Sequence, residues 1–368
     1  MKKIYLDNAA ATPLSSELIQ YLYDLFYQFY NPSSQYQDGK ISKAIIEKSR
    51  LNVANFVSAD KDDILFTSSG SASNTLAIKG YVQKHNCSVL YMPTLHKSIL
   101  KCVENIKKSY QLKVDSKGFL NFDDLKEWLD TNEKFLVVIE FANSELGTIQ
   151  PVKKIIDLCH FYNAKVYIDC TGSISQLQLN QKVLDADMFG FSAHKLGSLK
   201  GCGILYKKKD IELEPLVYGI QENGLFGGTE NLLSIASIGK VCELYNYSKY
   251  CTSRNYVYGY INKNIPNTYL IGCDLDDRLP CNLYMCIKNV NSESLMTLMD
   301  LDGIQIGTGS ACNSGNKTPS TTLLAIGLDK EDLYSCIRLT FSGYESIEEL
   351  NYICETLNKN ITKLRSFN

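Results

Sequence analysis

The chain has 368 residues, of which 45% are hydrophobic and 21% are charged, and its formal net charge at pH 7 is −2. This length predicts two or three domains, or one large and one small domain, with enough apolar residues for a full core. The low net charge, without a basic block, argues against nucleic acid or an anionic membrane as a partner.

The N-terminal sequence MKKIYLDNAA lacks the apolar stretch of a signal peptide, and apolar runs such as FLVVIEFA at 135–142 are too short to cross a bilayer. We therefore expect a soluble cytoplasmic protein. The thirteen cysteines include no CxxC pair, which argues against a disulfide framework and a zinc ribbon. No metal site is predicted.

In chain order, a short extended segment over 1–13 is followed by a helix that starts near Ser15. Further helices are predicted at 40–58, 75–84, 97–107, 122–131 and 151–162. Strands are predicted at 64–67, 89–92, 135–141, 165–169, 188–192 and 203–206. Because strands alternate with helices of about ten residues, we predict an α/β fold with a mostly parallel sheet covered on both faces.

The pattern changes after about residue 216. A glycine-rich stretch is followed by a long helical region over 230–260, then by strands near 283–287 and 336–341 and helices near 292–302 and 346–365. We interpret the chain as a large α/β domain at 14–260 and a smaller α+β domain formed by 1–13 and 261–368, which carries a loop with a cysteine.

Lys195 lies in DMFGFSAHKLGSLKGCG at 187–203, between an apolar, strand-like run and a glycine-rich run. Partial burial lowers the pKa of a lysine ammonium group, and small neighbours let a flat ring approach it. Lys195 is therefore a candidate for imine formation with a carbonyl cofactor. A solvated loop lysine is the alternative.

Two other features lie at the ends of predicted strands. Ser68–Ser73 leads into a helix, where backbone N–H groups and hydroxyls form a phosphate site, or else an ordinary serine-rich cap. Asp169 ends the strand KVYID, where ligands bind in open α/β sheets, although a lone carboxylate there can also be a cap. Paired with Lys195, it suggests pyridoxal 5'-phosphate (PLP) with its ring nitrogen kept protonated by the aspartate.

Three further residues are candidates for chemistry, each with a structural alternative. His96 follows a strand and suits ring stacking or proton transfer, or a purely structural role. Cys312 lies in GTGSACNSG at 307–315, a run of small residues that favours a mobile nucleophilic thiol over a loop cysteine without a role. Arg338 lies inside the apolar run CIRLT, where it binds either a substrate carboxylate or a structural acid.

Many segments of the chain carry a family resemblance when taken together. They are IYLDNAAATP at 4–13, NPSS at 31–34, ILFTSSG at 64–70, LAIKG at 76–80, HKSIL at 96–100, NSELGTIQPV at 143–152, YIDCTGS at 167–173, FSAHKLGSLKGCGILY at 191–206, GGTEN at 227–231, GSACNSG at 309–315 and IRLTFS at 337–342. In this order and spacing, the chain resembles the PLP-dependent cysteine desulfurases (the NifS/IscS group of class V aminotransferase-like enzymes) nearly end to end.

The resemblance implies a homodimer of fold-type-I subunits, each with a large domain around a mostly parallel seven-stranded sheet and a smaller α+β domain. It implies conversion of L-cysteine to L-alanine with a persulfide on Cys312, for transfer to a sulfur-acceptor protein that the sequence does not name. Such an acceptor serves iron–sulfur cluster assembly, tRNA thiolation, DNA sulfur modification or a specialised pathway.

The resemblance also implies a role for each site residue. Lys195 is the Schiff-base lysine that removes the α-proton, Asp169 the partner of the ring nitrogen, and His96 the ring-stacking acid/base. Cys312 attacks the substrate sulfur. The other implied contacts are Gly70, Ser71, Ser192 and His194 to the phosphate, Ser144 to the cofactor, Arg338 and Asn143 to the substrate, and the partner subunit's Thr229 to the phosphate.

The chain departs from the family pattern at several positions. Ser144 and Gly172 stand where the family has two amide side chains beside the ring oxygen, and the phosphate turn continues with Ser71-Ala72 instead of Thr-Glu. The retained lysine, aspartate, histidine and cysteine favour a divergent active enzyme. Two alternatives remain: a related PLP-dependent C–S or C–Se lyase, and a weakly active homologue that acts as a binding partner in a sulfur-transfer complex.

Overall fold

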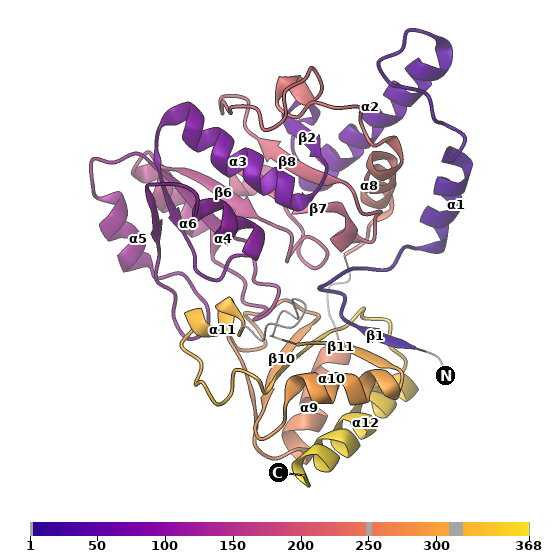
Figure 1. Ribbon diagram of the computed structural model, residues 1–368, viewed down its shortest axis with the longest axis vertical. Coiled ribbons are helices and arrows are strands. Elements are labelled where there is room, and N and C mark those ends of the chain that lie inside the picture. The colour runs from indigo at the N-terminus through magenta and orange to yellow at the C-terminus, as the bar shows by residue number, and fades with distance from the viewer. Residues whose placement is uncertain (1–2, 248–251, 309–318, 368) are drawn as a thin grey trace.

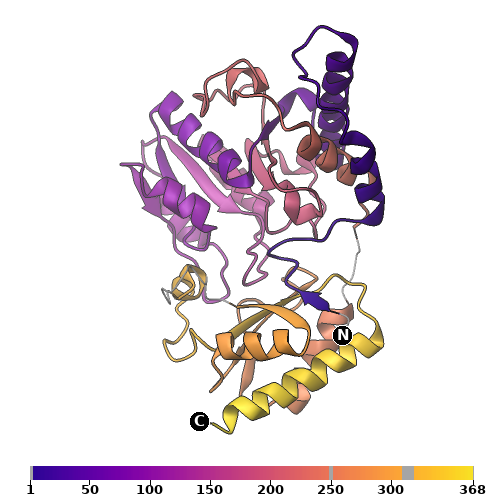
Figure 2. The same cartoon turned by 45° about the vertical axis from the view of Figure 1, so that its right-hand side comes forward.

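The computed structural model describes residues 3–247, 252–308 and 319–367, which form two units, one above the other in Figure 1. The upper unit is built around a seven-stranded sheet and the lower unit around a five-stranded sheet. The first strand and the last helix both belong to the lower unit, as Figure 2 also shows. Within the described ranges, no helix combines the length and apolar character needed to cross a bilayer.

The seven-stranded sheet has the order β2-β8-β7-β6-β5-β3-β4. Its strands are β2 (Ile64–Thr67), β3 (Ser88–Tyr91), β4 (Ser109–Gln111), β5 (Phe135–Glu140), β6 (Lys165–Asp169), β7 (Met188–Ser192) and β8 (Gly203–Lys207). β8 runs antiparallel to both of its neighbours, and the other pairs are parallel. The prediction of an α/β fold with a mostly parallel seven-stranded sheet is confirmed.

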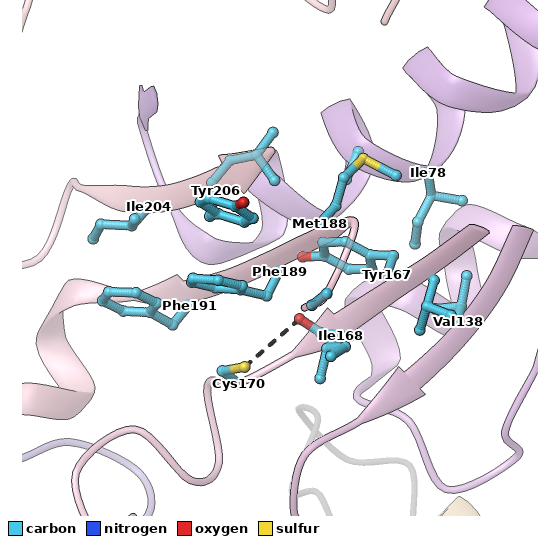
Figure 3. Close-up of a cluster of buried hydrophobic side chains, with 14 of the residues drawn as sticks. Ile78, Val138, Tyr167, Ile168, Cys170, Met188, Phe189, Phe191, Ile204 and Tyr206 are labelled. Carbon is cyan, nitrogen blue, oxygen red and sulfur yellow. Dashed lines mark hydrogen bonds between the residues drawn. The ribbon is translucent and has the colours of Figure 1, made fainter. Parts of the chain in front are cut away.

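The central strands are buried on both faces, which is why they occur in the sequence as continuous apolar runs instead of alternating ones. All residues of β5 and β7 are buried, and only the first residue of β6 is partly exposed. Figure 3 shows part of this core, where Phe189 stacks on Tyr206 with 4.6 Å between ring centroids. This packing fixes the ends of the parallel strands along one edge of the sheet.

Helices surround this sheet, and side-chain caps explain where several of them begin. They are α1 (Ser16–Leu25), α2 (Gln37–Val57), α3 (Gly70–His85), α4 (Lys97–Val103), α5 (Phe122–Leu129), α6 (Val152–Phe161), α7 (Gln181–Leu184) and α8 (Leu232–Leu244). Ser69 caps α3 by accepting a hydrogen bond from the Ala72 N–H at 3.2 Å. The cap starts α3 at Gly70, earlier than the predicted start at 75, because the small residues of this turn already belong to the helix.

The lower unit has the strand order β1-β11-β12-β10-β9. Its elements are β1 (Ile4–Leu6), α9 (Thr252–Asn264), β9 (Thr268–Leu270), β10 (Asn282–Ile287), α10 (Ser292–Leu301), β11 (Ile304–Thr308), α11 (Thr321–Ala325), β12 (Cys336–Thr340) and α12 (Ile347–Arg365). β1 pairs in parallel with β11, and α9, α10 and α12 pack together with this sheet. The domain boundaries inferred from the sequence stay a prediction.

Arg278 lies between β9 and β10, where the lower unit meets the loop after β5, and only 2% of its surface is exposed. Its guanidinium donates hydrogen bonds to the carbonyl oxygens of Leu146, Ile271 and Cys273, the last at 2.6 Å, and to the Asn282 side chain at 2.9 Å. Burial lowers its pKa to about 10. Arg278 therefore joins the two units through backbone acceptors.

Replacing Arg278 by methionine is expected to destabilise the protein by about 3 kcal/mol, because several buried carbonyl groups lose their donors at once. Urea unfolding followed by tryptophan fluorescence measures the loss as a lower midpoint. Arg365→Met, at a partly exposed arginine that donates to two carbonyl groups, is the matched control and should shift the midpoint far less. Equal midpoints for Arg278→Met and the wild type would contradict the interpretation.

Candidate active site

A cavity of about 490 Å³ lies at the edge of the large sheet where the parallel strands end. Its walls come from the start of α3, the turns after β3 and β5, the end of β6 and the segment after β7, and from the start of α11 in the lower unit. This is the edge where open α/β sheets bind ligands. Most predicted site residues line it: Gly70, Ser71, His96, Asn143, Ser144, Asp169, Ser192, His194 and Lys195.

Lys195 follows β7 in a short helical turn over Ala193–Leu196. Its Nζ donates hydrogen bonds to the carbonyl oxygens of Ala9 and Ala10, the second at 2.9 Å. Its own carbonyl oxygen accepts a hydrogen bond from Thr12 Oγ1 at 2.7 Å. The segment that links β1 to α1 therefore holds both the backbone and the amine of Lys195.

The charge state of Lys195 is shifted toward the neutral amine. Burial lowers its pKa to about 8, and the positive charge of Arg338 lowers it as well, while the carboxylates of Asp7 and Asp169 raise it. A lysine with this pKa is partly neutral near physiological pH and can act as a nucleophile or as a base.

Asp169 and His96 reach the cavity from neighbouring parts of the sheet edge. Asp169 ends β6 with 5% of its surface exposed, and its Oδ1 accepts a hydrogen bond from the Thr171 N–H at 2.9 Å. His96 caps α4 by accepting from the Ser98 N–H, and its ring is exposed to the cavity. Desolvation lowers the pKa of His96. The positive charge of Lys195 also lowers this pKa, whereas the carboxylate of Asp169 raises it. Its imidazole is therefore available in the neutral form.

The serine-rich turn brings a helix start against β7 and β8. A Cβ added to Gly70 would lie 2.9 Å from the Ser192 Cβ, and one added to Gly203 would lie 2.2 Å from the Ser69 backbone. The close approach therefore requires glycine at both positions. Ser192 Oγ lies 2.9 Å from His194 Nδ1. A helix N-terminus, a hydroxyl and an imidazole together are a donor set that suits a phosphate group.

Arg338, in β12, lies beside this site. Its Nη2 forms an ion pair with Asp7 Oδ1 at 2.7 Å, and its Nη1 donates to the Ser144 carbonyl oxygen at 3.2 Å. Its Nε is buried without a hydrogen-bond partner in the described chain. Arg338 is not among the described residues that line the cavity, so its predicted grip on a substrate carboxylate stays a prediction.

Asn143 lines the cavity, but its amide group is engaged by the protein itself. Its Nδ2 donates to the Glu140 carboxylate at 3.1 Å and to the Thr94 carbonyl oxygen at 2.9 Å. Its Oδ1 accepts from the backbone N–H groups of Glu145 and Leu146. Asn143 thus shapes the turn after β5, and its predicted contact with the substrate stays a prediction.

Ser144 and Gly172, two positions at which the chain departs from the family pattern, lie next to each other. A Cβ added to Gly172 would lie 2.7 Å from the Ala142 carbonyl oxygen and 3.3 Å from the Ser144 Cβ. Any larger side chain at position 172 would therefore need a shift of the β5 turn. Both residues line the cavity, so its wall is formed here by backbone and a hydroxyl instead of amide side chains.

Two predicted residues are not brought to this cavity by the described chain. Thr229 is exposed and absent from the described lining residues, and its predicted role toward the partner's site stays a prediction. Cys312 lies outside the described residues. On its C-terminal side, Ser320 donates a hydrogen bond to the Glu145 carboxylate at 2.6 Å, and Thr321 and the residue after it line the cavity. The described chain that follows Cys312 is therefore anchored at the cavity wall.

Residue-by-residue reasoning missed Glu140, Thr94 and Glu145, all of which line the cavity. A signal was present for the first of them. Glu140 ends the apolar run FLVVIE just as Asp169 ends KVYID, and a carboxylate at the end of a buried parallel strand belongs to the ligand edge of the sheet.

In chemical terms, the cavity combines an amine of lowered pKa, a buried carboxylate, a neutral imidazole and a helix N-terminus. Such a set can bind an anionic, flat cofactor, attach its carbonyl carbon to an amine and move protons beside it. Single surface residues do not produce this combination, because it requires three strand ends and a helix start to meet.

Comparison with known proteins covers nearly the whole chain. The aminotransferase class-V family matches residues 4–353. The cysteine desulfurase IscS of Dictyoglomus turgidum is 33% identical over 381 aligned positions, which cover 99% of this chain and 96% of the relative.

Two solved structures have the same fold over almost their full length. The NifS-like protein from Rickettsia africae superimposes with a TM-score of 0.88 at 26% identity, covering 98% of this chain and 99% of that one. SspA in complex with cysteine superimposes with a TM-score of 0.82 at 26% identity, covering 93% of this chain and 100% of the other.

Proposed function

The chain belongs to the class-V aminotransferase family and, within it, to the cysteine desulfurases, and we propose that it carries out this reaction with PLP and Cys312. In this reaction L-cysteine becomes L-alanine, and the sulfur atom is transferred to the enzyme thiol as a persulfide. The observation that carries the proposal is the convergence of Lys195, Asp169 and the N-terminus of α3 on one cavity.

The residues present fit PLP. The close packing at Gly70 and Gly203 forms a cradle at a helix N-terminus, where Ser192 and His194 supply further donors for a phosphate. Asp169, buried at the end of β6, suits a protonated ring nitrogen, and Lys195 suits the aldehyde carbon because its pKa is about 8. When bound, PLP supplies an electron sink for the negative charge that develops at the substrate α-carbon.

Residues of the chain would carry out proton transfer and the attack on the substrate sulfur. Lys195 Nζ takes the α-proton, and the neighbouring imidazole of His96 is suited to hold or return protons on its side of the cavity. Cys312, as a thiolate, attacks the substrate sulfur, so that one S–S bond forms as the C–S bond breaks. The former cysteine carbon skeleton takes up one proton at Cβ and regains one at Cα, where Lys195 Nζ can return it, and it leaves as alanine.

A homodimer is part of this proposal. Large apolar side chains of α1 and the loop after it lie exposed on one stretch of the chain: Ile19, Tyr23, Phe26, Tyr27 and Phe29. Exposed apolar surface of this extent on one short stretch of chain is typical of a protein–protein interface. A second copy of the chain would cover it and would bring the partner subunit's Thr229 within the reach that the family pattern implies.

Replacing Cys312 by serine is expected to lower alanine formation from L-cysteine by about 100-fold or more, because a hydroxyl is a far weaker nucleophile toward sulfur than a thiolate. Alanine and sulfide are measured with a thiol reductant present. PLP binding, read from the visible absorbance of the protein, should be unchanged.

Cys281→Ser, at a half-buried cysteine outside this cavity, is the matched control and should keep wild-type activity. Alanine formation that survives in Cys312→Ser would rule out the persulfide step and would leave a PLP-dependent lyase. A wild-type protein that neither binds PLP nor forms alanine would rule out both enzyme functions and would leave a binding role in a sulfur-transfer complex.

A further inference from the structure

Glu140 is a buried carboxyl group in the active-site wall that the proposed chemistry does not use. It ends β5, with only 6% of its surface exposed, and it lines the same cavity as Asp169. The residues before it in β5 are apolar and buried. A carboxyl group in such a position is costly unless it is hydrogen-bonded and its charge is compensated or removed.

The contacts of Glu140 join two turns of the site. Its Oε1 accepts a hydrogen bond from Thr94 Oγ1 at 2.6 Å, and both carboxyl oxygens lie 3.1 Å from Asn143 Nδ2. Asn143 Nδ2 also donates to the Thr94 carbonyl oxygen at 2.9 Å. Thr94 belongs to the turn that carries His96, and Asn143 to the turn that carries Ser144. Glu140 therefore connects two turns of the cavity wall that follow the neighbouring strands β3 and β5.

The neighbour of Glu140 in the sheet is a second carboxylate. Glu140 and Asp169 are register partners on the parallel strands β5 and β6, so their side chains leave the sheet on the same face. Two carboxylates that share a low-dielectric site do not ionise independently. The pKa of Glu140 is raised to about 8, chiefly by burial; the hydrogen bonds from Thr94 and Asn143 oppose this rise, and the charges of Asp169 and Glu145 add to it.

Other charged groups border the same space. Lys195 follows β7, and His96 and Lys97 start α4; all three line the cavity together with Glu145 from the turn after β5. The hydrogen-bond partners of the Glu140 carboxyl group in the described chain are Thr94 and Asn143, so none of these cations is paired with it. The carboxyl group thus has polar donors but no paired cation.

We propose that Glu140 is a positioning residue that stays protonated, joins the His96 turn to the Ser144 turn, and leaves Asp169 as the single carboxylate for a cationic ring nitrogen. The inference rests on the proposed binding of PLP. Glu140 is not placed to touch the reacting atoms, and it acts through the two turns that it joins. A neutral acid in this place keeps the polar bridge without adding a second negative charge.

Thermal unfolding of the cofactor-free protein between about pH 5 and pH 9 tests the bound proton. The folded protein keeps this proton to higher pH than the unfolded chain, where glutamate titrates near pH 4.3. The stability that the proton on Glu140 contributes is therefore lost as pH rises through this window, whereas E140Q, which lacks the acid, has no such contribution to lose. We expect the melting temperature of E140Q minus that of the wild type to grow up to about pH 8 and then level off. A difference independent of pH overturns the bound proton.

PLP affinity of the cofactor-free protein tests the positioning role. E140Q keeps an acceptor for Thr94 and should bind PLP within about threefold of the wild type. E140L fills the same space but leaves Thr94 Oγ1 without an acceptor and Asn143 Nδ2 with only the Thr94 carbonyl oxygen, and should bind PLP about tenfold more weakly. E104Q, at an exposed glutamate just after α4, is the control and should match the wild type.

The PLP affinities of E140L and E140Q decide whether Glu140 has a positioning role. Wild-type affinity in E140L, or an equal loss in E140Q and E140L, overturns the positioning role. If no protein binds PLP, the wild type included, the proposed function fails and the positioning role fails with it. The melting comparison on the cofactor-free protein still decides in that case whether Glu140 holds a proton.

Discussion

Replacing Lys195 by alanine is expected to lower the rate of alanine formation from L-cysteine by about 1000-fold or more, because in the proposed reaction the same amine attaches the cofactor and moves the α-proton. The geometry supports a large effect. Its Nζ lies in a cavity that lowers its pKa to about 8, and the carbonyl oxygens of Ala9 and Ala10 hold it in position.

The measurement is a steady-state alanine assay, combined with borohydride reduction and peptide mass spectrometry to find the lysine that carries PLP. Lys101→Ala, at an exposed lysine on α4, is the control and should leave both readouts unchanged. If Lys195→Ala keeps more than a tenth of the wild-type rate, or if the reduced cofactor is found on another lysine, the assignment of Lys195 is wrong.

The second large effect is expected at Asp169. Asp169→Asn keeps the shape of the side chain and its acceptor for the Thr171 N–H, but it removes the negative charge at the end of β6. We expect the rate to fall by about 100-fold or more, because the proposed partner charge of the cationic ring nitrogen would be lost. PLP affinity should fall as well, which a fluorescence titration of the cofactor-free protein measures.

Asp130→Asn, at an exposed aspartate after α5, controls for a general effect of removing a carboxylate. The two readouts of Asp169→Asn separate binding from chemistry, since saturating PLP restores occupancy but not the charge. An unchanged rate at saturating PLP would show that Asp169 contributes to binding alone.

The architecture of the large unit could be predicted because its strands are buried on both faces. The runs ILFT, KVYID and MFGFS became β2, β6 and β7 with the predicted bounds. β11 was not predicted: its residues IQIGT lead directly into a glycine-rich run, and the strand depends on pairing with β1, at the other end of the chain. Local sequence carries no information about such a distant partner.

In the candidate site too, some features could be predicted from local sequence and others depend on the folded chain. Lys195, Asp169 and His96 were identified because each stands at a strand end, and topology alone brings such residues to one edge. The contacts of Arg338 with Asp7, and of Glu140 with Thr94, depend on side-chain directions in the folded chain. No spacing in the sequence encodes them. For the same reason, the engagement of the Asn143 amide by Glu140 was not predicted.

The segment that holds Lys195 has a consequence for how the protein is made. Ala9 lies 186 positions from the lysine it contacts, and Asp7 lies 331 positions from Arg338, its ion-pair partner in β12. During synthesis, residues near the N-terminus leave the ribosome first, but their partners β11 and β12 emerge last. Contacts between residues so far apart in sequence form slowly, because a long loop must close first. The amine of Lys195 therefore gains its final surroundings only after the whole chain has been translated, which delays the assembly of a reactive lysine until folding is complete.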